Sequence, residues 1–128
     1  MTGRIALALV AGCCMSVQAT AGPLEQTLAK LEPEFRSHQV CILRGLDAVR
    51  RDPLLRKADR MKTSIFSQAV LEGTKLKAEG GAVRSGPRWY ALSFSCDLTA
   101  NLMKATSFSF TRGAEIPERD WDRLGLWR

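Results

Sequence analysis

Apolar side chains recur at two different spacings, which divide the chain into a helical half and a β half. Leu24, Leu28 and Leu31 follow Gly22-Pro23 at helical spacing and predict a short first helix. Beyond Pro33, apolar residues continue at steps of seven, four and three, which share one helix face: Phe35, Ile42, Leu46 and Val49. The pattern predicts an amphipathic helix over about residues 33–51, with Cys41 on the flank of its apolar face.

A further helix is predicted over about residues 52–62. Asp52-Pro53 has the form of an N-cap and a first helical residue. Apolar residues then follow at steps of four, three and four: Leu54, Ala58, Met61 and Ile65. Residues 63–71 fit a strand or a helix equally well, and Glu72-Gly73-Thr74 ends them.

The second half carries the alternation of a half-buried sheet. One strand is predicted over residues 75–85, where Gly80-Gly81 indicates a bulge or a close backbone approach. After the turn at Gly86-Pro87, a second strand alternates through an apolar set: Tyr90, Leu92, Phe94, Cys96 and Leu98. A third strand covers 103–111, with Phe108 and Phe110 inward, and ends at Arg112-Gly113.

The C-terminal residues predict a short helix. Pro117 followed by acidic residues is typical of a helix start, and apolar side chains beyond it are expected to cover an edge of the sheet: Trp121, Leu124, Leu126 and Trp127. The fold class is therefore α+β, with N-terminal helices packed on a three-stranded antiparallel meander and a short C-terminal helix.

The first 21 residues have the composition of an export signal. Arg4 precedes an apolar run over 5–17, and Ala19-Thr20-Ala21 supplies the small residues of a cleavage site. The run is shorter than the roughly 18–20 residues that span a membrane. We expect a signal peptide at 1–21 and one small periplasmic or secreted domain at 22–128. Val10-Ala11-Gly12-Cys13 leaves lipid anchoring through Cys13 as an alternative.

Two cysteines then remain in the exported domain, Cys41 and Cys96. An even pair in a small exported domain favours a disulfide. Two oxidised sulfurs and a single histidine, His38, are too few ligands for a metal site. No cofactor is expected.

The chain is basic, with a formal net charge of +6, and cations are dense between Arg44 and Lys62. A solvated helix face explains such a stretch, and contact with an anionic envelope component or another periplasmic protein is its functional interpretation. Nucleic acid is not expected, because the protein is exported and no aromatic residue interleaves with these cations.

Residues 80–85 and the turn beyond them carry the most unusual local pattern. Arg84, Arg88 and Trp89 are candidate contacts for an anion or a glycan, on a sheet face kept open by small residues. The structural alternative is a bulged strand with a turn arginine and a half-buried tryptophan. No catalytic residue is assigned: His38 lacks a recognisable partner motif, and the C-terminal acids fit a helix start.

Several segments together resemble the bacterial family known as domain of unknown function 930. They are Leu31-Glu32-Pro33 before Gln39-Val40-Cys41, residues 80–85 before Arg88-Trp89-Tyr90, residues 92–96, and Glu115-Ile116-Pro117 with Trp121. The resemblance covers about residues 28–127. It implies an exported single-domain protein, supports the pairing of Cys41 with Cys96, and supplies no activity.

The preferred functional hypothesis is an exported, non-enzymatic binding or accessory domain of the cell envelope. One alternative is a small secreted hydrolase that uses His38 and a nearby carboxylate. Another is a periplasmic inhibitor that acts through the basic helix or a sheet edge.

Overall fold

The structure is a computed structural model that describes residues 2–3, 8–14 and 22–128. The expected signal peptide, residues 1–21, therefore lies mostly outside the described residues, although Cys13 and Cys14 are described and exposed. In the described part of the chain, no helix is long and apolar enough to cross a membrane.

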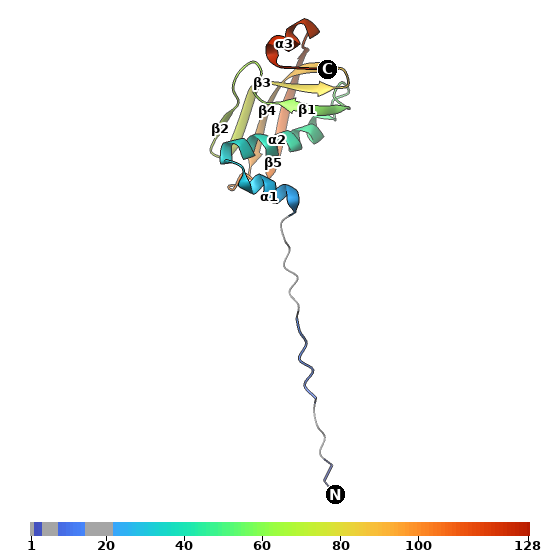
Figure 1. Cartoon of the computed structure of the whole chain (residues 1–128), viewed down its shortest axis with the longest axis vertical. Helices are drawn as coiled ribbons and strands as arrows, with labels where there is room; N and C mark the ends of the chain where they lie inside the picture. The colour runs from blue at the N-terminus through green and yellow to red at the C-terminus, as the bar shows by residue number, and fades with distance from the viewer. Residues whose placement is uncertain (1, 4–7, 15–21) are drawn as a thin grey trace.

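Within residues 22–128, two helices precede the strands and two short helical segments follow them; Figure 1 shows the arrangement. The elements in chain order are α1 (Pro23–Lys30), α2 (Pro33–Val49), β1 (Ala58–Lys62), β2 (Val70–Glu72), β3 (Lys75–Ser85), β4 (Arg88–Leu98), β5 (Ala105–Glu115), the 3-10 helix η1 (Glu118–Asp120) and α3 (Trp121–Leu124). Both N-terminal helices begin at a proline, whose missing N–H costs nothing at a first helical turn.

The sheet is antiparallel and has five strands, not the three that the sequence predicted. The order β1-β3-β4-β5 contains the predicted meander, and β2 pairs with the half of β3 that β1 leaves free. The predicted bulge at Gly80-Gly81 is confirmed by a register shift between Ala78 and Gly81. The third strand extends beyond its predicted end to Glu115.

The predicted helix over 52–62 is wrong, because a bulged strand imitates helical spacing. β1 shifts register between Ala58 and Arg60, so Ala58 and Met61 lie three residues apart and are both buried. Asp52 is not a helix cap: its side chain accepts a hydrogen bond from the Leu54 N–H at 2.9 Å, which closes a turn. Arg112 on β5 binds the same carboxylate at 2.9 Å.

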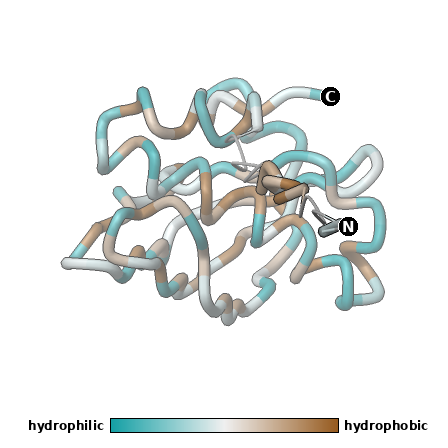
Figure 2. Tube along the Cα trace, turned by 90° about the horizontal axis from the view of Figure 1, so that it is seen from below, coloured by the Kyte–Doolittle hydropathy of each residue, from teal (hydrophilic) through white to brown (hydrophobic). Residues whose placement is uncertain are grey.

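The main core lies between α2 and one face of the sheet. The alternating set on β4 points into it, and Cys41 of α2 is joined to Cys96 of β4 by a disulfide with a Cα–Cα distance of 6.1 Å. Val49 is buried as its helical spacing predicted, whereas Phe35 is 54% exposed. Figure 2 shows apolar segments running through the middle of the domain and hydrophilic loops around it.

The opposite face of the sheet is partly covered by the C-terminal segment. Ala82 of β3 and Trp89 of β4 point away from the main core and form a second buried cluster with Ile116, Trp121 and Leu126. The apolar tail residues were predicted to cover an edge of the sheet; they instead cover part of this face, over the inner strands β3 and β4. We call this side of the sheet the outer face.

Arg36 of α2 fixes the position of α1 through carbonyl groups. Its guanidinium donates to the carbonyl oxygens of Leu28, Ala29 and Leu31 at 2.8–3.0 Å, and to that of Asn101 at 2.9 Å. These bonds give donors to the carbonyl groups where α1 ends, and that of Leu28 also accepts a hydrogen bond from the Leu31 N–H at 3.2 Å.

Candidate functional site

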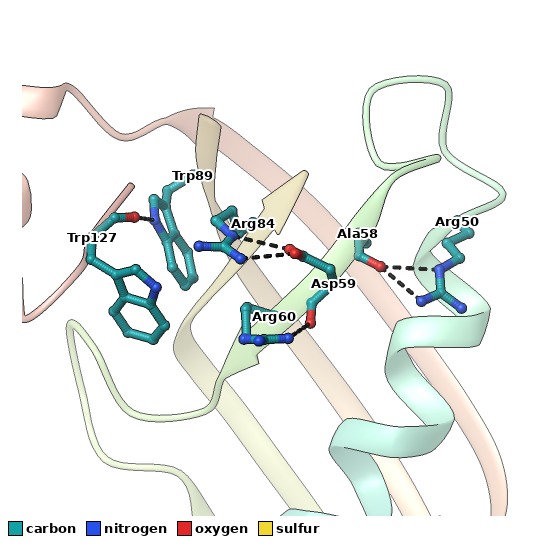
Figure 3. A network of polar contacts seen from close by, with 7 residues as sticks. All are labelled: Arg50, Ala58, Asp59, Arg60, Arg84, Trp89 and Trp127. Carbon is teal, nitrogen blue, oxygen red and sulfur yellow. Dashed lines mark hydrogen bonds and ion pairs between the residues drawn. The ribbon is translucent and has the colours of Figure 1, made fainter. Parts of the chain in front are cut away.

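Cationic and aromatic side chains meet where β1, β3 and β4 pass the C-terminal segment (Figure 3). The guanidinium of Arg84 lies 5.9 Å from the ring centroid of Trp89 and 5.8 Å from that of Trp127. Its Nε and Nη2 donate to the two carboxylate oxygens of Asp59 at 3.0 Å and 2.8 Å. Only 13% of the Arg84 side chain is exposed, so its position is well defined.

Trp127 is placed by backbone and side-chain contacts from both sides. Its carbonyl oxygen accepts a 2.7 Å hydrogen bond from Nε1 of Trp89, and the two rings meet edge to face. Lys62 of β1 lies with its ammonium 4.7 Å from the Trp127 centroid, which is cation–π distance. The Trp127 residue remains 44% exposed, so its ring is available to a ligand.

Arg60 is the third cation beside Arg84 and Lys62, and the pairing of β1 with β3 brings it to the same part of the sheet. Arg60 is the register partner of Arg84, and Lys62 is that of Ala82, so both lie on the outer face. Arg60 donates to the backbone oxygen of Asp59 at 2.8 Å. We call Arg60, Lys62, Arg84, Trp89 and Trp127, together with Asp59, the cation–tryptophan cluster.

The cluster has more positive than negative charge. Hydrogen bonding from Arg84 is the main reason that the pKa of Asp59 lies below its usual range, and the charges of Arg84 and Arg60 add to this effect. One carboxylate therefore faces two guanidinium groups, while Lys62 pairs with no carboxylate within residues 22–128 and donates to the Gly125 carbonyl oxygen at 3.4 Å. Such a surplus attracts anions.

The three binding residues predicted from the sequence have different surroundings. Arg84 is held in the cluster as described, and Arg88 is exposed beside Glu115, with 3.5 Å between its Nε and a carboxylate oxygen. Trp89 has no exposed area, so it supports the cluster from beneath instead of offering a surface. Binding of a ligand here stays a prediction.

The sequence patterns did not identify three residues of the cluster as site residues: Arg60, Lys62 and Trp127. They come from strands and a tail that are far apart in sequence, and only the β1–β3 register and the fold of the C-terminal segment join them. The available signal was the dense cationic stretch that ends at Lys62, together with a tryptophan close to the C-terminus.

The part of the outer face beyond the C-terminal segment is open, as the small residues predicted. A depression of about 330 Å³ lies there, lined by residues that include Lys77, Glu79, Ser93, Ser95, Ser109 and Thr111. Its hydroxyl groups can exchange hydrogen bonds with a polar ligand, but the opposite charges of Lys77 and Glu79 give the lining no net charge that would select one.

His38 lies on the α2 side of the sheet, where α2 meets the end of β1. Its Nδ1 is 2.8 Å from Oγ1 of Thr63, and burial lowers its pKa, an effect that the charge of Glu34 opposes. A histidine bonded to a hydroxyl has the geometry of a base and a nucleophile. Thr63 is only 8% exposed, however, and Glu34 acts through its charge alone.

The C-terminal acids form surface ion pairs. Glu118 pairs with Arg128, and Asp120 pairs with Arg123 at 3.5 Å. Within the described ranges, no group of three or more His, Cys, Asp or Glu side chains could hold a metal ion. The cation–tryptophan cluster is accordingly the best-defined candidate site.

The chain belongs to the family called Domain of Unknown Function (DUF930), whose model matches residues 28–126. The match spans both disulfide cysteines and all of the cation–tryptophan cluster except Trp127. No curated protein and no solved structure matches the chain.

Proposed function

We propose that this family member is an exported, non-enzymatic binding or accessory domain that holds an anionic saccharide component of the cell envelope. The observation that carries the proposal is the cation–tryptophan cluster, where Lys62 and Arg84 both lie within cation–π distance of the half-exposed Trp127 ring. Arg60 adds a third cation beside them, and Asp59 is the one carboxylate of the cluster. Cations select the charge of a ligand, and an exposed aromatic ring offers a flat apolar surface to a sugar ring.

The cluster is supported from beneath, which favours binding by a preformed surface. Trp89 is buried and bonded to the Trp127 backbone, and the Asp59 carboxylate fixes the Arg84 guanidinium at two points. A ligand that binds to groups already held in place loses less conformational entropy than one that must order them. The site therefore requires no rearrangement of the sheet.

The proposal is tested by titrating the protein without residues 1–21 against polygalacturonate, a phosphorylated glycan and neutral dextran. Intrinsic tryptophan fluorescence follows binding, and a Trp127→Phe variant identifies the responding ring. We expect both anionic polymers to change the fluorescence, dextran to leave it unchanged, and the variant to lose the change. Equal responses to dextran and polygalacturonate would count against the proposal. So would binding to phosphatidylglycerol vesicles without binding to either anionic polymer, which would identify a lipid surface.

A further inference from the structure

β5 is the last strand of the sheet on its side, and no strand of the described chain pairs with its outer edge. It is 11 residues long, and residues 105–111 contain no charged residue, proline or glycine. Natural proteins usually protect long edge strands with such residues, because the free N–H and C=O groups pair readily with another chain. The edge of β5 is thus suited to accept a further strand.

Two hollows lie side by side between this edge and α2. The first, of about 280 Å³, reaches Ala105 and is mainly apolar, with Leu28, Val40, Leu43 and Met103 among its lining residues. The second, of about 260 Å³, has Phe108 of β5 on one side. On its other side lie Arg44, Asp47 and Ala48 of α2, together with Arg51 just beyond the end of that helix. Arg44 lines both hollows, which together form what we call the α2–β5 groove.

The second hollow carries uncompensated positive charge. Arg44 and Arg51 are exposed, and within residues 22–128 neither belongs to an ion pair. Asp47, the acid in this hollow, already pairs with Arg50 at 3.3 Å. An acidic group entering the hollow would therefore meet two free guanidinium groups, which suit carboxylates well.

We propose that the α2–β5 groove binds an extended acidic segment of a partner protein, which adds a strand to β5. The backbone of that segment would hydrogen-bond to the β5 edge, an apolar side chain would fill the first hollow, and an Asp or Glu would reach Arg44 and Arg51. Because side chains alternate between faces of a strand, the apolar and acidic residues must be an even number of positions apart.

Charge distinguishes this partner from a second copy of the chain. If β5 paired with β5 of another copy, that strand would bring one acidic side chain, Glu115, whose carboxylate already lies 3.5 Å from Nε of Arg88. The structure therefore favours a different protein that supplies the carboxylate. This surface lies on the α2 side of the domain, away from the cation–tryptophan cluster, and the inference does not depend on the proposed function.

The test uses the chain without residues 1–21 and fluorescein-labelled peptides of the alternating sequence T-L-T-V-T-E-T-V-T. One matched peptide has Gln in place of Glu, and another has N-methyl groups on alternate backbone nitrogens. Fluorescence anisotropy gives the affinities of the wild type, of Arg44→Gln/Arg51→Gln, and of the equal-charge control Lys30→Gln/Arg119→Gln. Circular dichroism establishes that each variant is folded.

We expect the Gln peptide and the Arg44→Gln/Arg51→Gln variant each to weaken binding by about tenfold or more, as loss of a charge-assisted contact does. N-methylation should abolish binding, and the control variant should bind like the wild type. An N-methylated peptide that binds as well as its parent would overturn strand addition. If both double variants weakened binding equally, or if the Glu peptide did not bind at about 1 mM, the proposal that the α2–β5 groove binds an acidic segment would be overturned.

Discussion

The carboxylate of Asp59 holds the guanidinium of Arg84 by two hydrogen bonds, of 3.0 Å and 2.8 Å, beside two tryptophan rings. The pair joins β1 to β3 and fixes one wall of the cation–tryptophan cluster. Asp59 also occupies donor groups of Arg84 that would otherwise be available to an anionic ligand. Its carboxylate thus stabilises the site and competes with the ligand for the same cation.

Replacing Asp59 by Asn separates these two effects. The amide keeps one acceptor but removes the negative charge, so we expect tighter binding of polygalacturonate together with a small loss of stability. The loss should be about 1 kcal/mol or less, because half of the Asp59 side chain is exposed. Isothermal titration and urea unfolding measure the two quantities. Weaker binding by a folded Asp59→Asn protein would contradict this account.

The Cys41–Cys96 disulfide should supply a large part of the stability. It closes a sequence separation of 55 residues, for which the chain-entropy relation gives about 4 kcal/mol. We expect Cys41→Ala/Cys96→Ala to lower the free energy of unfolding by about that amount, measured by urea denaturation. The wild type should contain free thiols only where Cys13 and Cys14 are retained. A change below about 1 kcal/mol would show that the entropic estimate does not apply here.

Gly80 has no room for a side chain, because the loop after β1 crosses directly over it. A Cβ on Gly80 would lie 2.3 Å from the backbone nitrogen of Ser67, and the Gly80 carbonyl accepts hydrogen bonds from Ile65 and Phe66 at 2.8 Å. Gly80→Ala should therefore cost about 1–3 kcal/mol in thermal or urea unfolding. Gly22→Ala, where a Cβ would meet open space, is the control and should cost far less.

His38 should make stability depend on pH near neutrality. Because burial lowers its pKa in the folded chain, the unfolded chain takes up a proton first as the pH falls below about 6.5. The free energy of unfolding should accordingly decrease from pH 7.5 to pH 5.5, and a His38→Gln variant should show a smaller decrease. The same variant should retain polygalacturonate binding. A variant with the wild-type pH slope would show that His38 is not the responsible group.

The helices and the meander could be predicted because their patterns are local. Alternation from Tyr90 to Leu98 identifies β4 without reference to any partner strand, and the Gly80-Gly81 bulge follows from residue type alone. β1 could not be predicted in this way. Its bulge places Ala58 and Met61 on one face three residues apart, a spacing that a helix shares.

The candidate site was predictable only in part for a related reason. Arg84 and Trp89 are cross-strand partners in one hairpin, so a sequence pattern could place them together. Lys62 and Trp127 join them through pairing of β1 with β3 and through the C-terminal segment that crosses the outer face. Contacts between segments so far apart in sequence leave no periodic signal.

The most direct test of the central claim compares two double variants that remove equal charge. Arg60→Gln/Lys62→Gln removes cations from the cation–tryptophan cluster, and Lys30→Gln/Arg119→Gln removes two exposed cations elsewhere. Isothermal titration with polygalacturonate at 0.15 M salt, where the screening length is about 8 Å, gives both affinities. We predict that the first variant binds about tenfold or more weakly than the wild type, while the second binds nearly as well. An equal loss of affinity in both variants would contradict a defined site, because it would mean that polygalacturonate responds only to the net charge of the protein.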